Sequence, residues 1–232
     1  MGKLFTKIAT MCLMAGAAAP AWADVVNFSV DSSQSSASIE ILDSGVQSTP
    51  TTGSLILNLD SLTEPFGVAQ ITDLNLVLQN QLDFSLLGGL VSLSTRPNDT
   101  TLSLLLPGDG GTVTGGQFDQ LNNIMVISGI ADVSDPLGLL GAAGDSEFDL
   151  STLGQTLVDY TNVGLVKSGD QYTLTADFSL DQTVEFNGVD VDISITGTVV
   201  ANGFAAVPEP GSALALGALG LVAAGTYRRR RV

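Results

Sequence analysis

The stretch Val189-Asp190-Val191-Asp192-Ile193-Ser194-Ile195-Thr196 decides the fold class. Apolar side chains occupy its odd positions and polar ones its even positions, so an extended chain directs the two kinds to opposite faces. This two-residue period is typical of an antiparallel strand with one face in the core and one in water. The preceding pair, Asn187-Gly188, suits a two-residue hairpin turn that joins this strand to residues 184–186.

Similar alternation recurs through the middle of the chain. The alternating apolar sets are Leu55, Leu57 and Leu59; Leu74, Leu76 and Leu78; and Leu102, Leu104 and Leu106. Turn sequences such as Pro107-Gly108-Asp109-Gly110-Gly111 fall between them. The pattern predicts an all-β domain, an antiparallel β-sandwich or barrel of about ten to twelve strands. Residues 150–159 are an exception, because their leucine spacing allows a short helix.

The charge of the central span is strongly negative. Of the 24 carboxylates in the chain, 23 lie between Asp24 and Val207, where the only cations are Arg96 and Lys167, so the formal charge there is about −21. Such a field repels the phosphates of nucleic acids and attracts cations. We therefore expect no nucleic-acid partner, and the charge serves either solubility in salty surroundings or the binding of divalent cations.

Calcium is the ion that these carboxylates suit best, because it prefers oxygen ligands. The candidate ligands are Asp99, Asp109, Asp132, Asp135, Asp190 and Asp192. Their surroundings match neither an EF-hand loop nor a nonapeptide calcium repeat, and loop aspartates commonly stabilise turns through their own side chains. We expect no cofactor, with calcium as the one candidate.

The sequence lacks the side chains that most hydrolases use. It contains no histidine, and its single cysteine, Cys12, lies in an N-terminal apolar run. A Ser-His-Asp triad and a histidine-based zinc site are therefore excluded, and so is a cysteine nucleophile in the mature chain. The only tryptophan, Trp22, precedes the cleavage site predicted below, which removes the best platform for stacking on sugar rings. We expect no enzymatic activity.

Paired carboxylates leave one catalytic alternative open. Asp145 and Glu147 share a face if their segment is extended, and so do Asp190 and Asp192. A glycoside hydrolase needs two carboxyl groups at a defined separation. With so many carboxylates in the chain, a solvated outer face is the simpler explanation of both pairs.

The N-terminus has the three parts of a secretory signal peptide. Lys3 and Lys7 precede an apolar run over residues 8–19, and Ala21-Trp22-Ala23 forms a small-x-small cleavage site. The run is too short to span a bilayer comfortably. We predict that signal peptidase cuts after Ala23 and that the mature chain begins at Asp24.

The C-terminus also has three consecutive parts. They are the motif Val207-Pro208-Glu209-Pro210, an apolar segment over residues 211–227, and the basic cluster Arg228, Arg229, Arg230 and Arg231. In a helix the apolar segment reaches about 25 Å, slightly less than a hydrocarbon core of about 30 Å, so it predicts a short transmembrane helix. The arginines hold their end on the cytoplasmic side and leave the preceding domain outside.

These three parts, in this order, resemble the PEP-CTERM sorting signal of Gram-negative bacteria. The resemblance implies that exosortase, a membrane enzyme, recognises the tail and cleaves near the Pro-Glu-Pro motif. It also implies a link with extracellular polysaccharide, and it says nothing about the chemistry of the preceding residues. The chain therefore divides into a signal peptide (1–23), an acidic all-β domain (24–206) and a sorting tail (207–232).

Three functions are compatible with this division. The first is a structural or adhesive protein, held transiently at the inner membrane and then placed at the cell surface or in the extracellular matrix. The second is a ligand carrier, because Phe28-Ser-Val-Asp31, Ser36 and Gly53-Ser-Leu-Ile-Leu57 are similar to the opening of YceI-like lipid-binding barrels. The third is the carboxylate-based hydrolase. The absent catalytic side chains favour the first, whereas an empty apolar lumen would favour the second.

Overall fold

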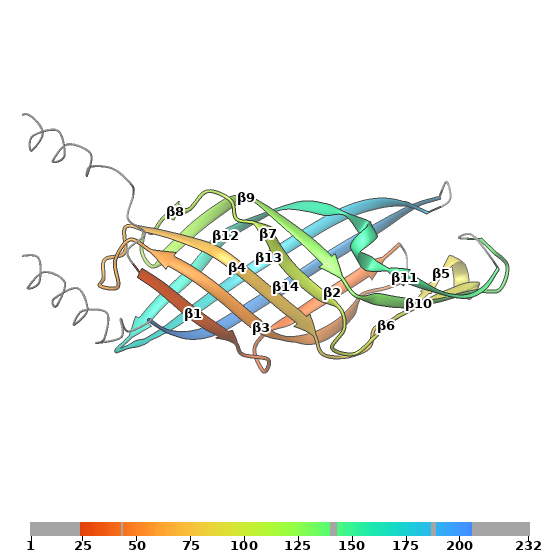
Figure 1. Ribbon diagram of the computed structural model, residues 1–232, viewed down its shortest axis with the longest axis horizontal. Coiled ribbons are helices and arrows are strands. Elements are labelled where there is room, and N and C mark those ends of the chain that lie inside the picture. Colours follow the sequence, from red (N-terminus) through yellow and green to blue (C-terminus); the bar gives the residue numbers. More distant parts are fainter. Residues whose placement is uncertain (1–23, 43, 140–142, 187–188, 206–232) are drawn as a thin grey trace, which may run out of the picture.

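The computed structural model describes residues 24–42, 44–139, 143–186 and 189–205, which form an elongated, almost entirely β structure (Figure 1). Its body consists of β1 (Asp24–Val30), β2 (Ser36–Ile41), β3 (Gln47–Leu59), β4 (Val68–Leu78), β7 (Thr101–Leu106), β9 (Gln117–Ser128), β12 (Gln155–Ser168), β13 (Gln171–Phe186) and β14 (Val189–Ala205). The shorter elements are β5 (Asp83–Leu86), β6 (Val91–Thr95), β8 (Gly111–Thr112), β10 (Ile130–Asp135), β11 (Gly144–Asp149) and the 3-10 turns η1 (Leu87–Gly89) and η2 (Leu150–Leu153). The expected all-β class is confirmed, with fourteen strands among the described residues.

The body is a closed antiparallel barrel in the order β3, β4, β7, β9, β12, β13, β14. It closes because β1 and β2 share one strand position between β14 and β3. β1 pairs with residues 201–205 of β14, and β2 pairs with residues 193–198. Ser35, in the turn between them, donates to the Val200 carbonyl (3.1 Å) and accepts from the Val200 N–H (2.9 Å). The barrel thus has eight strand positions with up-and-down connections.

The apolar half of each alternating strand fills the barrel lumen. Leu55, Leu57 and Leu59 of β3 are at most 1% exposed, and Leu76 and Leu78 of β4 are fully buried. An eight-stranded barrel has an interior just wide enough for such side chains to fill. The alternation predicted for these two strands is therefore confirmed, and it produces a packed core.

A buried amide network closes a gap in the barrel wall between β7 and β8, which both pair with β4. The Gln120 side chain accepts from the Ile71 N–H (2.6 Å) and donates to the Ile71 carbonyl (2.8 Å), as a neighbouring strand would. It also donates to Asn123 (2.7 Å), which accepts from the Gly108 N–H (2.9 Å). Gln120 and Asn123 are fully buried, so their amides replace the missing ladder hydrogen bonds. A Cβ at Gly108 would lie 1.8 Å from the Leu121 carbonyl oxygen, which explains the glycine.

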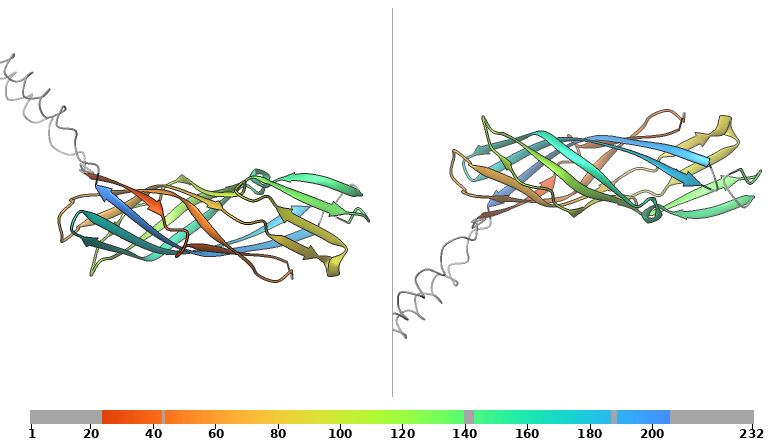
Figure 2. Two further views of the ribbon diagram at one scale, coloured as in Figure 1. Left: turned by 90° about the horizontal axis from the view of Figure 1, so that it is seen from below. Right: turned by 90° about the horizontal axis from the view of Figure 1, so that it is seen from above.

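Two hairpins inserted between barrel strands form a second sheet, here called the distal sheet. β5 and β6 follow β4, β10 and β11 follow β9, and β6 pairs with β10 to give the order β5-β6-β10-β11. Figures 1 and 2 show this sheet at the end of the molecule farthest from the start of β1 and the end of β14. Its apolar face, with Phe84 and Leu93, shares a cavity lining with Ile39 of β2 and Val191 of β14. The structure thus combines a barrel with a sandwich-like end.

Two local predictions have different outcomes. β13 and β14 pair as far as Phe186 and Val189, which leaves two connecting residues, as the hairpin prediction requires. The helix predicted over residues 150–159 is wrong, because only η2 is helical and β12 begins at Gln155. Gly154, with φ of 88°, ends the turn, and pairing of Val158 with Asn123 of β9 draws the rest into the barrel. Tertiary pairing has overridden local leucine spacing.

The predicted transmembrane segment, residues 211–227, lies outside the described residues. Among the residues that are described, no helix has the length and apolar character needed to cross a bilayer.

Candidate functional site

Both ends of the described domain leave the barrel side by side. Val26 of β1 pairs with Ala205 of β14, and Asn27 pairs with Phe204. Asp24, the predicted first residue of the mature chain, is the first residue of β1 and pairs with Leu59. The other predicted processing residues (Ala21, Ala23, Val207, Pro208, Glu209, Pro210, Arg228, Arg229, Arg230 and Arg231) lie outside the described residues. The described chain therefore begins and ends at the same end of the barrel, here called the proximal end, which lies opposite the distal sheet (Figure 2).

The outer face of the distal sheet carries two parallel rows of hydroxyl and carboxyl groups. Cross-strand pairing puts Asp83, Ser94, Asp132 and Glu147 in the first row, and Ser85, Ser92, Ser134 and Asp145 in the second. These eight side chains are exposed or half-buried. We call this surface the distal polar face. It exists only because two hairpins that are distant in sequence pair through β6 and β10.

Short hydrogen bonds order the carboxylates of this face. Ser94 Oγ (2.6 Å) and Gln81 Nε2 (2.7 Å) both donate to Asp83, and these hydrogen bonds lower the pKa of the Asp83 carboxyl. Ser134 Oγ donates to Asp145 (2.6 Å). Carboxylates held in this way are fixed acceptors, with oxygen lone pairs still available to other donors.

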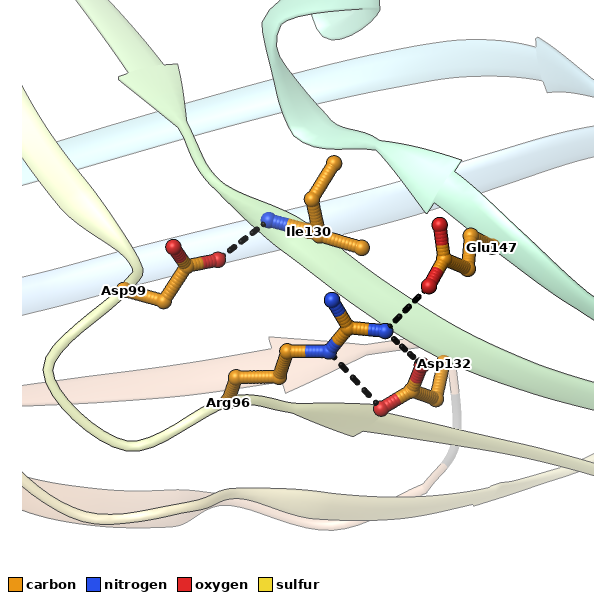
Figure 3. Close-up of polar contacts among 5 residues, drawn as sticks. All are labelled: Arg96, Asp99, Ile130, Asp132 and Glu147. Atoms are coloured by element: carbon orange, nitrogen blue, oxygen red, sulfur yellow. Dashed lines mark hydrogen bonds and ion pairs between the residues drawn. The ribbon is translucent and has the colours of Figure 1, made fainter.

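Arg96 is one of the two cations of the domain, and it joins two strands of the distal polar face (Figure 3). Its Nε donates to Asp132 (3.1 Å), and its terminal nitrogen pairs with both Asp132 and Glu147. The Arg96 hydrogen bonds lower the pKa of the Asp132 carboxyl. Nearby, Asp99 accepts from the Ile130 N–H (2.7 Å) and fixes the start of β10. Arg96 therefore links β10 and β11 next to the end of β6.

The six predicted calcium ligands are spread over separate parts of the structure. Asp99 and Asp132 have the partners given above, and Asp109 forms an isolated backbone bridge with Leu121. Asp135 is buried and accepts from the Leu139 N–H (2.9 Å). Asp190 and Asp192 are exposed on β14, where Asp192 accepts from Thr183 Oγ1 (2.6 Å).

Within the described ranges, no group of three or more acidic or other metal-ligating side chains is close enough to hold a metal ion. Two of the candidate aspartates, Asp99 and Asp135, instead accept hydrogen bonds from backbone N–H groups, which is the alternative that the sequence left open. The calcium hypothesis stays a prediction without a clustered site to support it.

The carboxylate pairs lie on shared strand faces, as the two-residue spacing predicted. Asp145 and Glu147 both project from the outer face of β11, where Ser134 and Arg96 engage them. A general acid for glycoside hydrolysis needs a raised pKa, whereas Arg96 lowers the pKa of neighbouring Asp132. The pairs therefore resemble an ordered polar surface more than an acid–base dyad.

A cavity of about 110 Å³ lies under the distal sheet, and sequence reasoning missed it. Its lining comes from β2, β5, β6, β9, β10, β11, η2 and β14, and is mostly apolar. Most of the contributing residues look like ordinary core positions in their own elements. Only the long-range packing of the distal sheet on the barrel creates the cavity, so no local signal could have revealed it.

Comparison with known proteins identifies the tail. Residues 206–231 match the family model of the PEP-CTERM protein-sorting motif. The chain carries a PEP-CTERM sorting signal. It is therefore an exported protein that exosortase sorts, and the match extends one residue upstream of the predicted Val207 boundary. No curated protein matches the chain. The PEP-CTERM match covers the tail alone, so the role of the β domain must be argued from its own surfaces.

Proposed function

We propose that this PEP-CTERM protein is a structural or adhesive component of the cell surface or extracellular matrix, where its distal polar face contacts extracellular polysaccharide. The observation that carries the proposal is the pairing of Val26 with Ala205, which brings both ends of the domain to the proximal end. A tail anchored there points the distal sheet away from the membrane. The barrel then separates the distal sheet from the membrane by its own length.

The chemistry of the distal polar face supports a sugar partner. Its rows contain serine hydroxyls, which donate and accept, and carboxylates, which accept from sugar hydroxyls. The two rows run across four strands, so a polymer chain with repeated hydroxyl groups can contact several of their side chains at once. The high negative charge of the domain favours neutral or cationic polysaccharide over a strongly anionic one.

The processing steps complete the proposal. Signal peptidase removes residues 1–23 after export, and the apolar tail segment holds the precursor in the inner membrane while exosortase acts. Cleavage near Pro208-Glu209-Pro210 then transfers or releases the domain. Proline disfavours helix and strand pairing around it, which suits a junction that a protease must reach.

The competing functions receive less support. A carrier needs space in the lumen, whereas leucines at most 1% exposed fill the barrel beside β3 and β4. A hydrolase needs two carboxyl groups that converge on a cleft, whereas Asp145 and Glu147 lie on an outer strand face with partners of their own. We therefore propose no catalytic role and no cofactor.

Co-sedimentation with exopolysaccharide purified from the native host tests the proposal. The variant Ser92→Ala/Ser134→Ala/Asp145→Ala removes three polar groups from the second row of the distal polar face and should reduce the bound fraction several-fold. The matched control, Thr175→Ala/Asp177→Ala/Ser179→Ala, removes the same kinds of group from the exposed face of β13 and should bind as the parent does. Absence of binding by the parent, or an equal loss in the control, would contradict the proposal.

A further inference from the structure

The distal cavity has the size and lining of a small-molecule site. Its volume of about 110 Å³ is lined by side chains that include Phe84, Leu93, Ile127, Phe148 and Val191. An engineered apolar cavity of about 150 Å³ stays dry and binds benzene, so this space suits an occupant of roughly five to seven heavy atoms. Packed protein interiors rarely leave such a space unfilled.

One polar group of the lining has no hydrogen-bond partner. Thr100 is fully buried, and its Oγ1 finds no donor or acceptor among the described residues. Thr95, its neighbour in the lining, differs because its Oγ1 accepts from the Leu82 N–H (3.0 Å). A buried hydroxyl left unpaired costs free energy, and an occupant of this cavity that hydrogen-bonds Thr100 would remove that cost.

The lack of unpaired charge in the described lining disfavours an ionic occupant. Among the described residues, Glu147 is the one charged residue of the lining; its side chain is 66% exposed and pairs with Arg96. The cavity therefore offers no unpaired charge to neutralise an ion, and burial of an unpaired charge is costly.

We infer that the distal cavity binds a small, uncharged, mainly apolar molecule with one hydrogen-bonding oxygen, which the Thr100 hydroxyl holds. This site lies where the distal sheet packs against β2, β9 and β14, and it shares Glu147 with the distal polar face. It gives the exported protein a ligand-binding capacity beyond the proposed adhesive role. Phenol has the required size and oxygen, and benzene is the matched probe without the oxygen.

Titration calorimetry on the mature protein, purified from its host after processing, tests the assignment with these two probes. The parent should bind phenol. Thr100→Val removes the hydroxyl with little change in shape and should weaken phenol about three- to tenfold, the effect of one hydrogen bond, while benzene binding stays the same. Thr51→Val is the matched control, because Thr51 Oγ1 is also buried and unpaired but does not line the cavity; it should change neither probe.

The position of the probe is checked by nuclear Overhauser contacts. Bound phenol should contact the Ile127 methyl groups and the Phe148 ring, and Thr100→Ser, which keeps the hydroxyl, should retain the preference for phenol over benzene. Failure of the parent to bind phenol would overturn the inference. So would contacts at another part of the surface, or equal loss of both probes in Thr100→Val.

Discussion

The proximal and distal regions share their longest strand but use it differently. In the barrel, Ile195, Val199 and Ala201 of β14 point into a filled interior. Nearer the start of the same strand, Val191 and Ile193 face a cavity under the distal sheet. The barrel encloses itself through neighbours along the chain, whereas the distal end depends on two hairpins meeting across β6 and β10. Closure by sequential strands gives dense packing, and the added sheet gives surfaces and space that a ligand or partner can use.

The largest expected effect concerns the proximal end, where the sorting tail leaves the barrel. Pro208→Ala/Glu209→Ala/Pro210→Ala should abolish cleavage by exosortase, because it removes the motif and replaces two prolines with alanine, which favours a helix at the junction. The precursor should then accumulate in the inner-membrane fraction. Ser212→Ala, a single substitution in the same tail outside the motif, should fractionate as the parent does. Normal release of the triple variant would show that sorting does not require the Pro-Glu-Pro motif.

The next effect tests how strongly the barrel depends on its buried network. Gln120→Leu leaves the N–H and carbonyl of Ile71 without their partners and should lower the free energy of unfolding by about 3–5 kcal/mol. Gln117→Leu changes an exposed glutamine on the same strand and should shift it by less than about 0.5 kcal/mol. Urea denaturation measures both. Similar losses in the two variants would show that the network is dispensable.

A smaller effect is expected when the same substitution, Val→Ile, is made at two positions of β14, one in the barrel and one beside the distal cavity. The difference in their effects on stability compares the packing of the two regions. Val199→Ile adds a methylene to the packed barrel and should destabilise the protein by about 1–2 kcal/mol. Val191→Ile adds the same group beside the distal cavity and should be neutral or stabilising by up to about 1 kcal/mol. Thermal and urea unfolding report the difference. If Val191→Ile were the more damaging change, the distal interior would be packed as tightly as the barrel.

The smallest effect concerns Arg96 on the distal polar face. Because Arg96 lowers the pKa of Asp132, the pair stabilises the fold above the ordinary carboxyl pKa of 3.8, and this contribution is lost as pH falls through the lower folded value. Arg96→Gln should therefore lower the urea midpoint slightly at pH 7, less so at high salt, and not at all once Asp132 is protonated.

A double-mutant cycle with Asp132→Asn isolates the coupling between the two side chains. The coupling should be measurable at pH 7 in low salt and should vanish below the folded pKa of Asp132. A coupling that persists at acid pH would mean that the ion pair is not its source.

Much of the fold was predictable because alternation is a local property. In the segments around Leu57, Leu76 and Val191, the alternation within each segment is enough to identify which side chains are buried. Leu106 departs from this pattern, with 54% exposure, because it lies at the end of β7 where the register with β9 shifts. The helix predicted over residues 150–159 failed for a related reason, since pairing with β9 decided the conformation of β12.

The sites were less predictable than the strands. The sorting tail is read from contiguous sequence, and the family match confirms it. The distal polar face and the cavity arise from contacts between residues dozens of positions apart, such as Arg96 with Glu147. Asp132 and Asp135 look like neighbouring calcium ligands in sequence, but β10 exposes Asp132 and buries Asp135.

Intact mass of the protein recovered from its native host tests most directly whether cleavable signals flank this barrel. The account predicts a chain that begins at Asp24 and ends near Pro210, without the apolar segment and its arginines. A product that still begins at Met1, or still ends in Arg228–Arg231 and Val232, would contradict it.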